Sequence, residues 1–218
     1  MMTLYSRAAD ARCHRVRIVL AEKAMAVRIV ETDPLNPPED LIDLNPYQTV
    51  PTLVDRDLVV YDPGIICEYL DERYPHPTLA SSDPAARAQS RVALRRIEQE
   101  WYAVADALEP GTGADRRERE RARKLLGESM LASEPLFRAR PWFLSDQYSQ
   151  LDAAVAPILW RLPHWDIDAQ ALAAAAPSLD RYAAKLFARP AFQRSLSTAE
   201  QLMRAEAPAP RKVSLPQT

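Results

Sequence analysis

The sequence predicts an α/β domain over residues 1–78, an all-helical domain over residues 84–206 and a flexible tail over residues 207–218. Three observations support this division. Short extended runs alternate with helical spacing in the first eighty residues, strand patterns nearly vanish from Asp83 onward, and the last twelve residues contain few apolar side chains. The composition, with 47% apolar and 27% charged residues, is that of an ordinary globular protein able to bury one core or two unequal layers.

The first domain has the predicted element order βαβ, then α, then ββα. Val16 and Val19 recur at the spacing of a helix face, whereas residues 27–31 alternate as in a strand. Asp62 followed by Pro63 is a favourable start for the last helix. One parallel crossover followed by an antiparallel hairpin and a helix is the thioredoxin-like arrangement. The expected strands are residues 2–6, 27–31, 52–54 and 58–60, and the expected helices are residues 12–25, 41–44 and 63–74.

The second domain is predicted to be entirely helical. Ser149 and Asp152 resemble a capping box with Asp in place of Glu, which satisfies unpaired backbone donors at the start of a helix. Pro157 is expected to break that helix and Pro163 to end it. The expected helices are residues 84–108, 115–136, 149–162, 177–187 and 197–203.

Charge and glycine content exclude several classes of function. The net charge is −2, and the run DRRERERARK at residues 115–124 alternates acids with bases, which is typical of a solvated helix face and not of a nucleic-acid patch. Only four glycines are present and no phosphate-binding glycine motif occurs, so a nucleotide enzyme is not expected. Three histidines far apart in the sequence predict no metal site, and no cofactor is expected.

The sequence also indicates a compartment. Cys13 and Cys67 lie in different segments without a CxxC motif, which argues against a disulfide framework or a structural zinc site. No signal-peptide pattern begins the chain, and no apolar stretch approaches the roughly 20 residues that span a bilayer. A reduced, cytoplasmic protein is expected.

A thioredoxin-like half joined to a helical half, with VPTLVD before a hairpin, resembles the glutathione S-transferase superfamily up to about residue 206. The proline of Val50-Pro51 stands where that superfamily keeps a cis proline, and the Ser149/Asp152 pair looks like its capping box. Within the superfamily, the chain most resembles the stringent starvation protein A family, whose bacterial members associate with RNA polymerase. The matching stretches are HRVRIVLAEK (14–23), DLIDLNP (40–46), VPTLVDR (50–56), EYLDERYPHP (68–77) and LWRLP (159–163).

The resemblance implies a ligand cleft that has lost part of its chemistry. In glutathione transferases the residue before the cis proline pairs with the cysteinyl part of glutathione, and Val50-Pro51 preserves that option. An acidic residue followed by Ser or Thr then binds the γ-glutamyl carboxylate, and stringent starvation proteins commonly have Glu-Ser. Here the pair is Asp62-Pro63, and proline offers neither a hydroxyl nor an N–H. Poor glutathione affinity and a vestigial cleft are expected.

Activation of a thiolate would need a donor near the first helix. Tyr5, Ser6 and Cys13 are the candidates, and a thiol near a helix N-terminus can have a lowered pKa. Packing at the helix–sheet interface is the favoured interpretation of Cys13, and Cys67 is expected in the core. A glutathione-dependent transferase using Ser6 or Cys13 is the alternative function.

Tyr74, Pro75, His76 and Pro77 form a rigid, partly aromatic segment, here named the exit segment. On its residues alone, an interdomain linker is the favoured interpretation. The resemblance reverses this, because stringent starvation proteins carry at this motif a surface pocket implicated in contact with RNA polymerase and its primary sigma factor. Residues 80–83 replace a more apolar segment expected at the rim of that pocket.

The resulting hypothesis is a non-enzymatic transcription regulator that binds RNA polymerase holoenzyme through protein contact and does not itself contact DNA sequence-specifically. A homodimer is expected from the habit of the family and from the long helical hairpin of residues 84–139. A structural adaptor with an unrelated partner is a further alternative.

Overall fold

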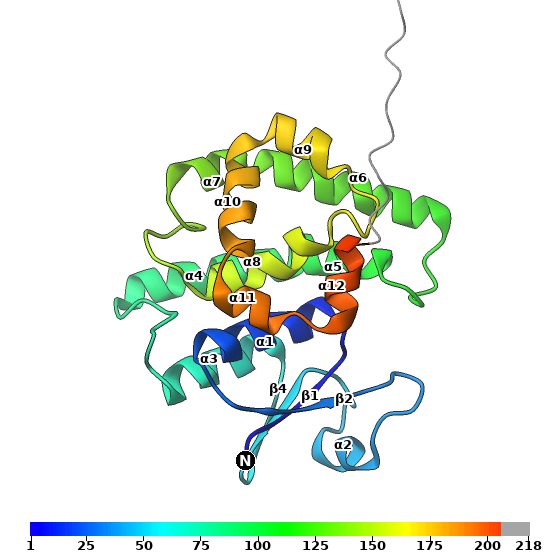
Figure 1. Cartoon of the computed structure of the whole chain (residues 1–218), viewed down its shortest axis with the longest axis vertical. Helices are drawn as coiled ribbons and strands as arrows, with labels where there is room; N and C mark the ends of the chain where they lie inside the picture. Colours follow the sequence, from blue (N-terminus) through cyan, green and yellow to red (C-terminus); the bar gives the residue numbers. More distant parts are fainter. Residues whose placement is uncertain (206–218) are drawn as a thin grey trace, which may run out of the picture.

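The computed structural model of the chain describes residues 1–205, so the predicted tail at residues 207–218 lies outside the described residues. A four-stranded sheet forms one end of the molecule, and two helices separate it from the helical domain (Figure 1). The elements of the first domain are β1 (Thr3–Ser6), α1 (Ala11–Glu22), β2 (Arg28–Glu31), α2 (Glu39–Leu44), β3 (Thr52–Asp55), β4 (Leu58–Tyr61) and α3 (Pro63–Arg73).

The sheet has the strand order β2-β1-β3-β4. β1 pairs in parallel with β2 and antiparallel with β3, so that Leu4 lies opposite both Ile29 and Leu53. Leu4 and Leu53 are fully buried beneath α1 and α3, which lie on one face of the sheet. This topology confirms the predicted thioredoxin-like domain.

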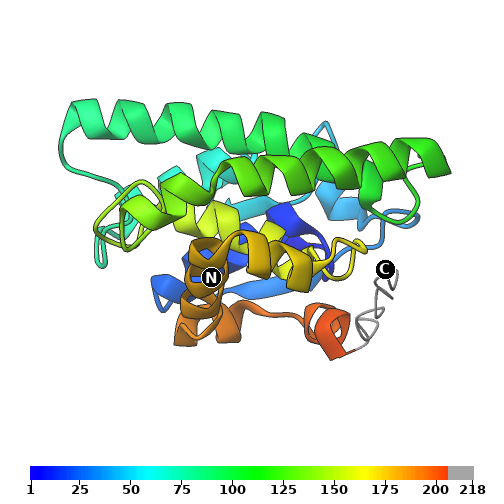
Figure 2. The same ribbon diagram turned by 90° about the horizontal axis from the view of Figure 1, so that it is seen from above.

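The helical domain begins with a long helical hairpin. The predicted helix 84–108 is a succession of α4 (Pro84–Ile97), a π-helical turn (Glu98–Tyr102), α5 (Ala103–Ala105) and a 3-10 turn (Asp106–Leu108). α4 and α6 lie side by side when the molecule is seen from above (Figure 2). The remaining helices are α6 (Arg116–Ala132), α7 (Glu134–Ala139), α8 (Gln150–Arg161), α9 (Ala169–Ala175), α10 (Pro177–Phe187), α11 (Pro190–Ser195) and α12 (Thr198–Ala205).

Three details of the helical domain differ from the sequence-based expectation. The expected helix 115–136 is divided between α6 and α7, whose first turn contains Pro135. The short helices α9 and α11 were not expected, since neither is long enough to show a clear period. The predicted break at Pro157 is wrong, because Pro157 lies inside a continuous α8. Every residue of α8 is buried, and that packing outweighs the ~3 kcal/mol that an interior proline costs.

The N-terminus of α8 confirms the predicted capping box. The Ser149 hydroxyl accepts the N–H of Leu151 at 3.2 Å, and the Asp152 carboxylate accepts the Ser149 N–H at 2.8 Å. Asp152 is fully buried and also accepts the Phe143 N–H and the Tyr182 hydroxyl. The box therefore fixes the central helix of the domain to its neighbours.

A buried charge cluster joins the two domains. Glu200, at the start of α12, accepts from Arg17 of α1 at 2.7 Å and from Arg161 of α8. Arg161 also donates to the carbonyl of Ala9 in the β1–α1 loop, at 2.8 Å. Because Arg161 and Glu200 are fully buried and Arg17 is 6% exposed, this cluster fixes the relative positions of the first helix and the C-terminal helices.

Among residues 1–205, no helix combines the length and the hydropathy that would be needed to cross a bilayer.

Candidate functional site

The exit segment lies at the end of α3, where the helix has just stopped. Tyr74 closes the helix, since its N–H donates to the Leu70 carbonyl at 3.0 Å, and its ring lies 5.3 Å from the Arg73 guanidinium. Tyr74 is half-buried, whereas Pro75, His76 and Pro77 are exposed. The His76-Pro77 bond is cis. The exposed part of the exit segment is thus a histidine between two prolines.

Two buried residues that no sequence pattern predicted support the exit segment. Lys23 and Asp71 form a buried ion pair that also contacts the backbone on either side of His76. In the sequence, Asp71 looks like a solvent-exposed acid of α3. Lys23 looks like an ordinary lysine at the C-terminal end of α1. Their spacing of 48 residues offered no local signal.

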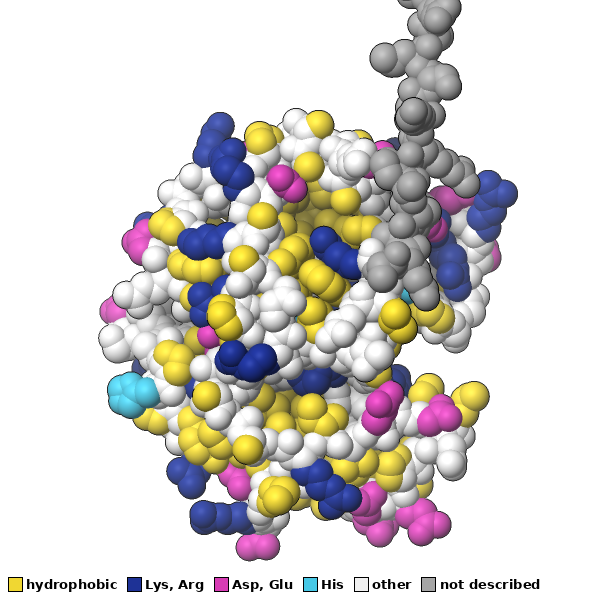
Figure 3. Space-filling model, viewed as in Figure 1, with side chains coloured by type: hydrophobic (Ala, Val, Ile, Leu, Met, Phe, Trp, Pro, Cys, Tyr) yellow, Lys and Arg dark blue, Asp and Glu magenta, His cyan; other side chains and the backbone are white. Residues whose placement is uncertain are grey.

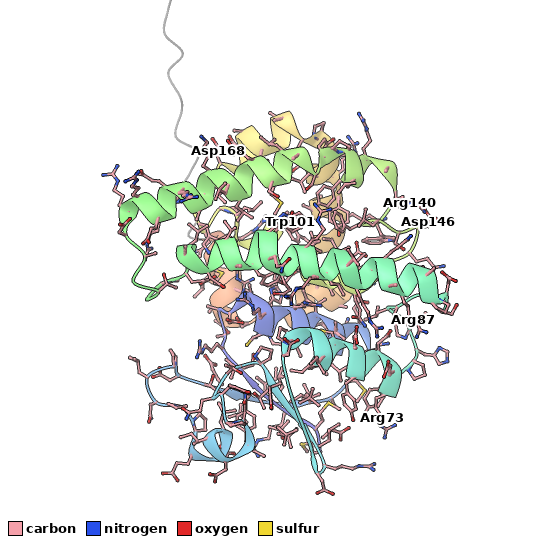
Figure 4. All side chains as sticks on the ribbon, turned by 180° about the vertical axis from the view of Figure 1, so that it is seen from behind. Arg73, Arg87, Trp101, Arg140, Asp146 and Asp168 are labelled. Atoms are coloured by element: carbon pink, nitrogen blue, oxygen red, sulfur yellow. The ribbon has the colours of Figure 1, made fainter. Side chains whose placement is uncertain are left out.

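A cavity of about 920 Å³ begins one residue beyond the exit segment. Residues 78–82 line it together with parts of α3, α4 and the loop before α8, while none of the four residues of the exit segment does. Arg87, Arg140 and Asp146 lie at its edge (Figure 4), and Arg140 donates to Asp146 at 2.7 Å. Ser81 and Ser82 therefore contribute to a polar lining close to the exposed histidine.

Asp62 and Pro63 of the predicted vestigial cleft lie at the opposite end of α3. With 11 residues, the helix separates Asp62 from the exit segment by about 16 Å. Asp62 has a φ of 84° and caps α3, because its Oδ1 accepts the N–H of Gly64 at 2.8 Å and of Ile65 at 3.1 Å. Pro63 occupies the first turn. The helix N-terminus is thus already satisfied by a carboxylate of the chain itself, and an incoming carboxylate would meet that negative charge.

The other predicted cleft residues are placed as follows. Val50-Pro51 is a cis peptide, as expected, with Pro51 buried before β3. The Tyr5 hydroxyl donates to Asp40, and burial together with this bond raises the pKa of Tyr5 to about 12. Ser6 is 1% exposed, and its hydroxyl accepts from Arg17 at 2.7 Å. Both hydroxyl groups therefore already have partners within the chain.

Both cysteines are fully buried. Burial raises the pKa of the Cys13 thiol, and the nearby Asp10 carboxylate adds to this rise. Burial also raises the pKa of Cys67 to about 11. Each thiol is therefore protonated at neutral pH, and the lowered pKa that a helix N-terminus can produce does not occur at Cys13.

His14 belongs to the buried charge cluster and not to a ligand site. Burial, followed by Arg161 and Arg17, lowers the pKa of His14 well below its ordinary value. The neutral ring accepts from Arg161 at Nδ1 and donates from Nε2 to the Ser195 hydroxyl, at 3.2 and 3.1 Å. Within residues 1–205, no group of three acidic, histidine or cysteine side chains is placed to hold a metal ion.

A second cavity, of about 590 Å³, lies between the C-terminal end of α1, β2 and residues 194–197. Hydrophobic side chains are visible in the hollow between α11 and β2 in Figure 3, and Leu20, Met25 and Val27 are among those that line it. The Arg17 guanidinium at its inner end is already bound to Ser6 and to Glu200. This hollow therefore offers mainly apolar surface, and Arg194, which also lines it, donates to the Ala21 carbonyl at 3.2 Å.

Glu109 is a second titratable group at the domain boundary. Burial raises its pKa to about 7, and the carboxylates of Asp10 and Asp106 add to this rise while Arg161 opposes it. Glu109 directly follows the 3-10 turn. Its carboxyl group lies close enough to Asp10, the N-cap residue of α1, for the two charges to interact. Glu109 is a half-buried acid of the domain interface whose carboxyl group changes charge near neutral pH.

Comparisons with known proteins match both domains of the chain. A family model described as the glutathione S-transferase N-terminal domain matches residues 11–73. The chain is 46% identical to the stringent starvation protein A homolog of Pasteurella multocida over 90% of each chain, and 43% identical to that of Coxiella burnetii over 94% of this chain and 95% of the relative. The Tau class glutathione S-transferase of mango (Mangifera indica) superposes with a TM-score of 0.78, 23% identity and coverage of 94% and 96%, which shows a common fold.

Proposed function

We propose a function that follows from family membership, since the chain belongs to the stringent starvation protein A family of the glutathione S-transferase superfamily. In this proposal the protein is a transcription regulator that binds RNA polymerase holoenzyme and its primary sigma factor. The exit segment is the contact site, and regulation acts through protein contact without direct reading of DNA.

The exposure of the exit segment is the observation that carries the proposal. A linker needs only to connect two domains, whereas Pro75, His76 and Pro77 are exposed together over a buried and hydrogen-bonded support. Two prolines limit the conformational entropy that is lost on docking, and an imidazole between them provides a polar contact. The cavity beside the segment enlarges the surface available to a partner.

We further propose that the chain lacks glutathione transferase activity. Supporting this, the carboxylate of Asp62 occupies the first free amides of α3, and Pro63 supplies neither a hydroxyl nor an N–H. The loss of two hydrogen bonds to a charged group, each worth about 1.5–3 kcal/mol, weakens binding by a few orders of magnitude. Cys13 and Ser6 are buried, and the hydroxyl of Ser6 is already bound.

A homodimer is part of the same proposal. α4 and α6 lie side by side on one face of the molecule (Figures 2 and 4), and they carry the exposed apolar residues Val92, Leu125 and Leu131. Light scattering is expected to give twice the 24.6 kDa mass of one chain. A Val92→Asp variant that remains dimeric would argue against α4 as the contact surface.

The decisive experiment is co-purification of the tagged chain with RNA polymerase holoenzyme. His76→Ala is expected to abolish or strongly reduce polymerase recovery, whereas His164→Ala, at another exposed histidine far along the chain, is the matched control. Unchanged recovery with His76→Ala would remove the exit segment as the contact site.

The enzyme alternative has its own measurement. Retention on immobilised glutathione together with turnover of a generic electrophile would contradict the non-enzymatic proposal. Cys13→Ser and Ser6→Ala variants would then identify which of the two side chains carries the activity.

A further inference from the structure

Lys23 is a buried cation, and its ammonium group donates to three acceptors within residues 71–77. It directly follows α1, and its side chain is 0% exposed. The ammonium group donates to the Asp71 carboxylate, to the Tyr74 carbonyl at 2.7 Å and to the Pro77 carbonyl. Since an ammonium group has three N–H donors, these three acceptors use all of them.

Asp71 extends the same connection beyond the exit segment. Its Oδ1 also accepts the backbone N–H of Leu79 at 2.8 Å. Leu79 is 3% exposed, and its carbonyl accepts the N–H of Gln150 at the start of α8, at 2.9 Å. A single ion pair therefore links α1, α3 and both sides of the exit segment, and Leu79 continues the link into the helical domain.

The exit segment contributes few donors of its own. Pro75 and Pro77 have no backbone N–H, and the segment lies between α3 and α4, outside any helix or strand. Because the carbonyl groups of Tyr74 and Pro77 reach one nitrogen atom, the chain between them bulges away from Lys23. Pro75 and His76 lie on this bulge, where both are exposed. Buried contacts thus determine how an exposed histidine is presented.

The exit segment is supported by a buried ion pair and not by an apolar contact. Withdrawing an ammonium and a carboxylate from water is costly, and a well-packed apolar pair often gives equal or greater stability. An apolar pair, however, could neither donate to two carbonyl groups nor accept the Leu79 N–H. Charge-assisted hydrogen bonds are also shorter and stronger than neutral ones. The ion pair therefore specifies a backbone geometry that apolar packing could not specify.

We propose that Lys23 and Asp71 are positioning residues that hold the exit segment in the conformation recognised by its protein partner. This inference rests on the proposed function, because it concerns the geometry of that same site. Pre-organisation reduces the conformational entropy lost on binding. Release of the segment consequently weakens binding even though every contact residue is still present.

The first test is amide hydrogen exchange in the free protein. In Lys23→Met, exchange of the Leu79 amide is expected to accelerate by about tenfold or more, whereas the amides of the interior of α8 keep their protection. Lys124→Met is the control, since that lysine is 75% exposed and pairs only loosely with Glu128. Exchange at Leu79 that is equal in Lys23→Met and in the wild type would overturn the proposal.

The second test separates positioning from stability. In the double variant Lys23→Met/Asp71→Leu an apolar pair replaces the ion pair, so the fold is expected to be retained. Its affinity for RNA polymerase holoenzyme is expected to fall by about tenfold or more. Wild-type affinity of the double variant would overturn the proposal. If the wild-type chain does not bind polymerase, the proposed function fails, and the exchange measurement alone decides whether Lys23 and Asp71 hold the segment.

Discussion

Asp152 offers the sharpest test of how the helical domain is held together. Its carboxylate is fully buried and accepts four hydrogen bonds, from the Phe143 N–H at 2.9 Å, the Ser149 N–H at 2.8 Å, the Ser149 hydroxyl at 3.2 Å and the Tyr182 hydroxyl at 2.6 Å. Asp152→Ala removes the acceptor and leaves these donors behind, two of them backbone amides.

The magnitude follows from the donors that lose their partner. An unsatisfied buried donor costs about 1–3 kcal/mol, so the three groups Phe143 N–H, Ser149 N–H and Tyr182 hydroxyl together cost roughly 3–6 kcal/mol after some relaxation. That is a large fraction of the 5–15 kcal/mol by which domains are typically stable. Asp152→Asn, which keeps one carbonyl acceptor, is expected to lose less.

Urea unfolding followed by tryptophan fluorescence measures the change in the free energy of unfolding. Asp146→Ala is the matched control, because that carboxylate is 71% exposed and its ion pair contributes about 1 kcal/mol or less. Hydrogen exchange should also show loosening at Gln150, whose amide joins α8 to Leu79. An Asp152→Ala protein within about 1 kcal/mol of the wild type would refute this account of the capping box.

Three further predictions concern buried or half-buried titratable groups. Burial raises the pKa of Glu109 from 4.5 to about 7, so the folded state binds this proton more tightly than the unfolded state and stability falls as pH rises between these values. Glu109→Gln should flatten that part of a thermal unfolding profile measured from pH 5 to pH 8, and an unchanged slope would contradict the assignment. Cys13 and Cys67 should react slowly with a thiol reagent until the protein is unfolded, because both are buried, and rapid labelling of the native protein would argue against their burial. Glu200→Gln leaves two buried guanidinium groups poorly paired and should cost about 3–5 kcal/mol in urea unfolding, against about 1 kcal/mol or less for Glu128→Gln at an exposed ion pair.

Local patterns predicted most of the first domain. The strands, the helices and the order βαβ, α, ββα follow from spacing and from turn residues that act over a few positions, and the sheet confirms them. The Ser149/Asp152 box was equally local, since both of its hydrogen bonds close within three residues. The cis peptide at Val50-Pro51 was expected from a family motif and is present.

Local patterns failed where packing outweighed them. Pro157 weakens a helix in isolation, but α8 is buried along its whole length and continues through it. Cys13 stands near a helix N-terminus, yet burial raises the pKa of its thiol. In both cases the neighbours that decide the outcome come from distant parts of the chain.

The sequence by itself determined the fold class, the family and the position of the exposed Pro-His-Pro motif, because these depend on short-range periodicity and on contiguous motifs. Only the tertiary structure decided what supports that motif and which partners the side chains of the predicted cleft have. Lys23 meets the carbonyl of Pro77 across 54 positions, and Glu200 meets Arg17 from the opposite end of the described chain. The pairing of a buried charge depends on distance in space and on exclusion of water, and local sequence patterns predict neither of them.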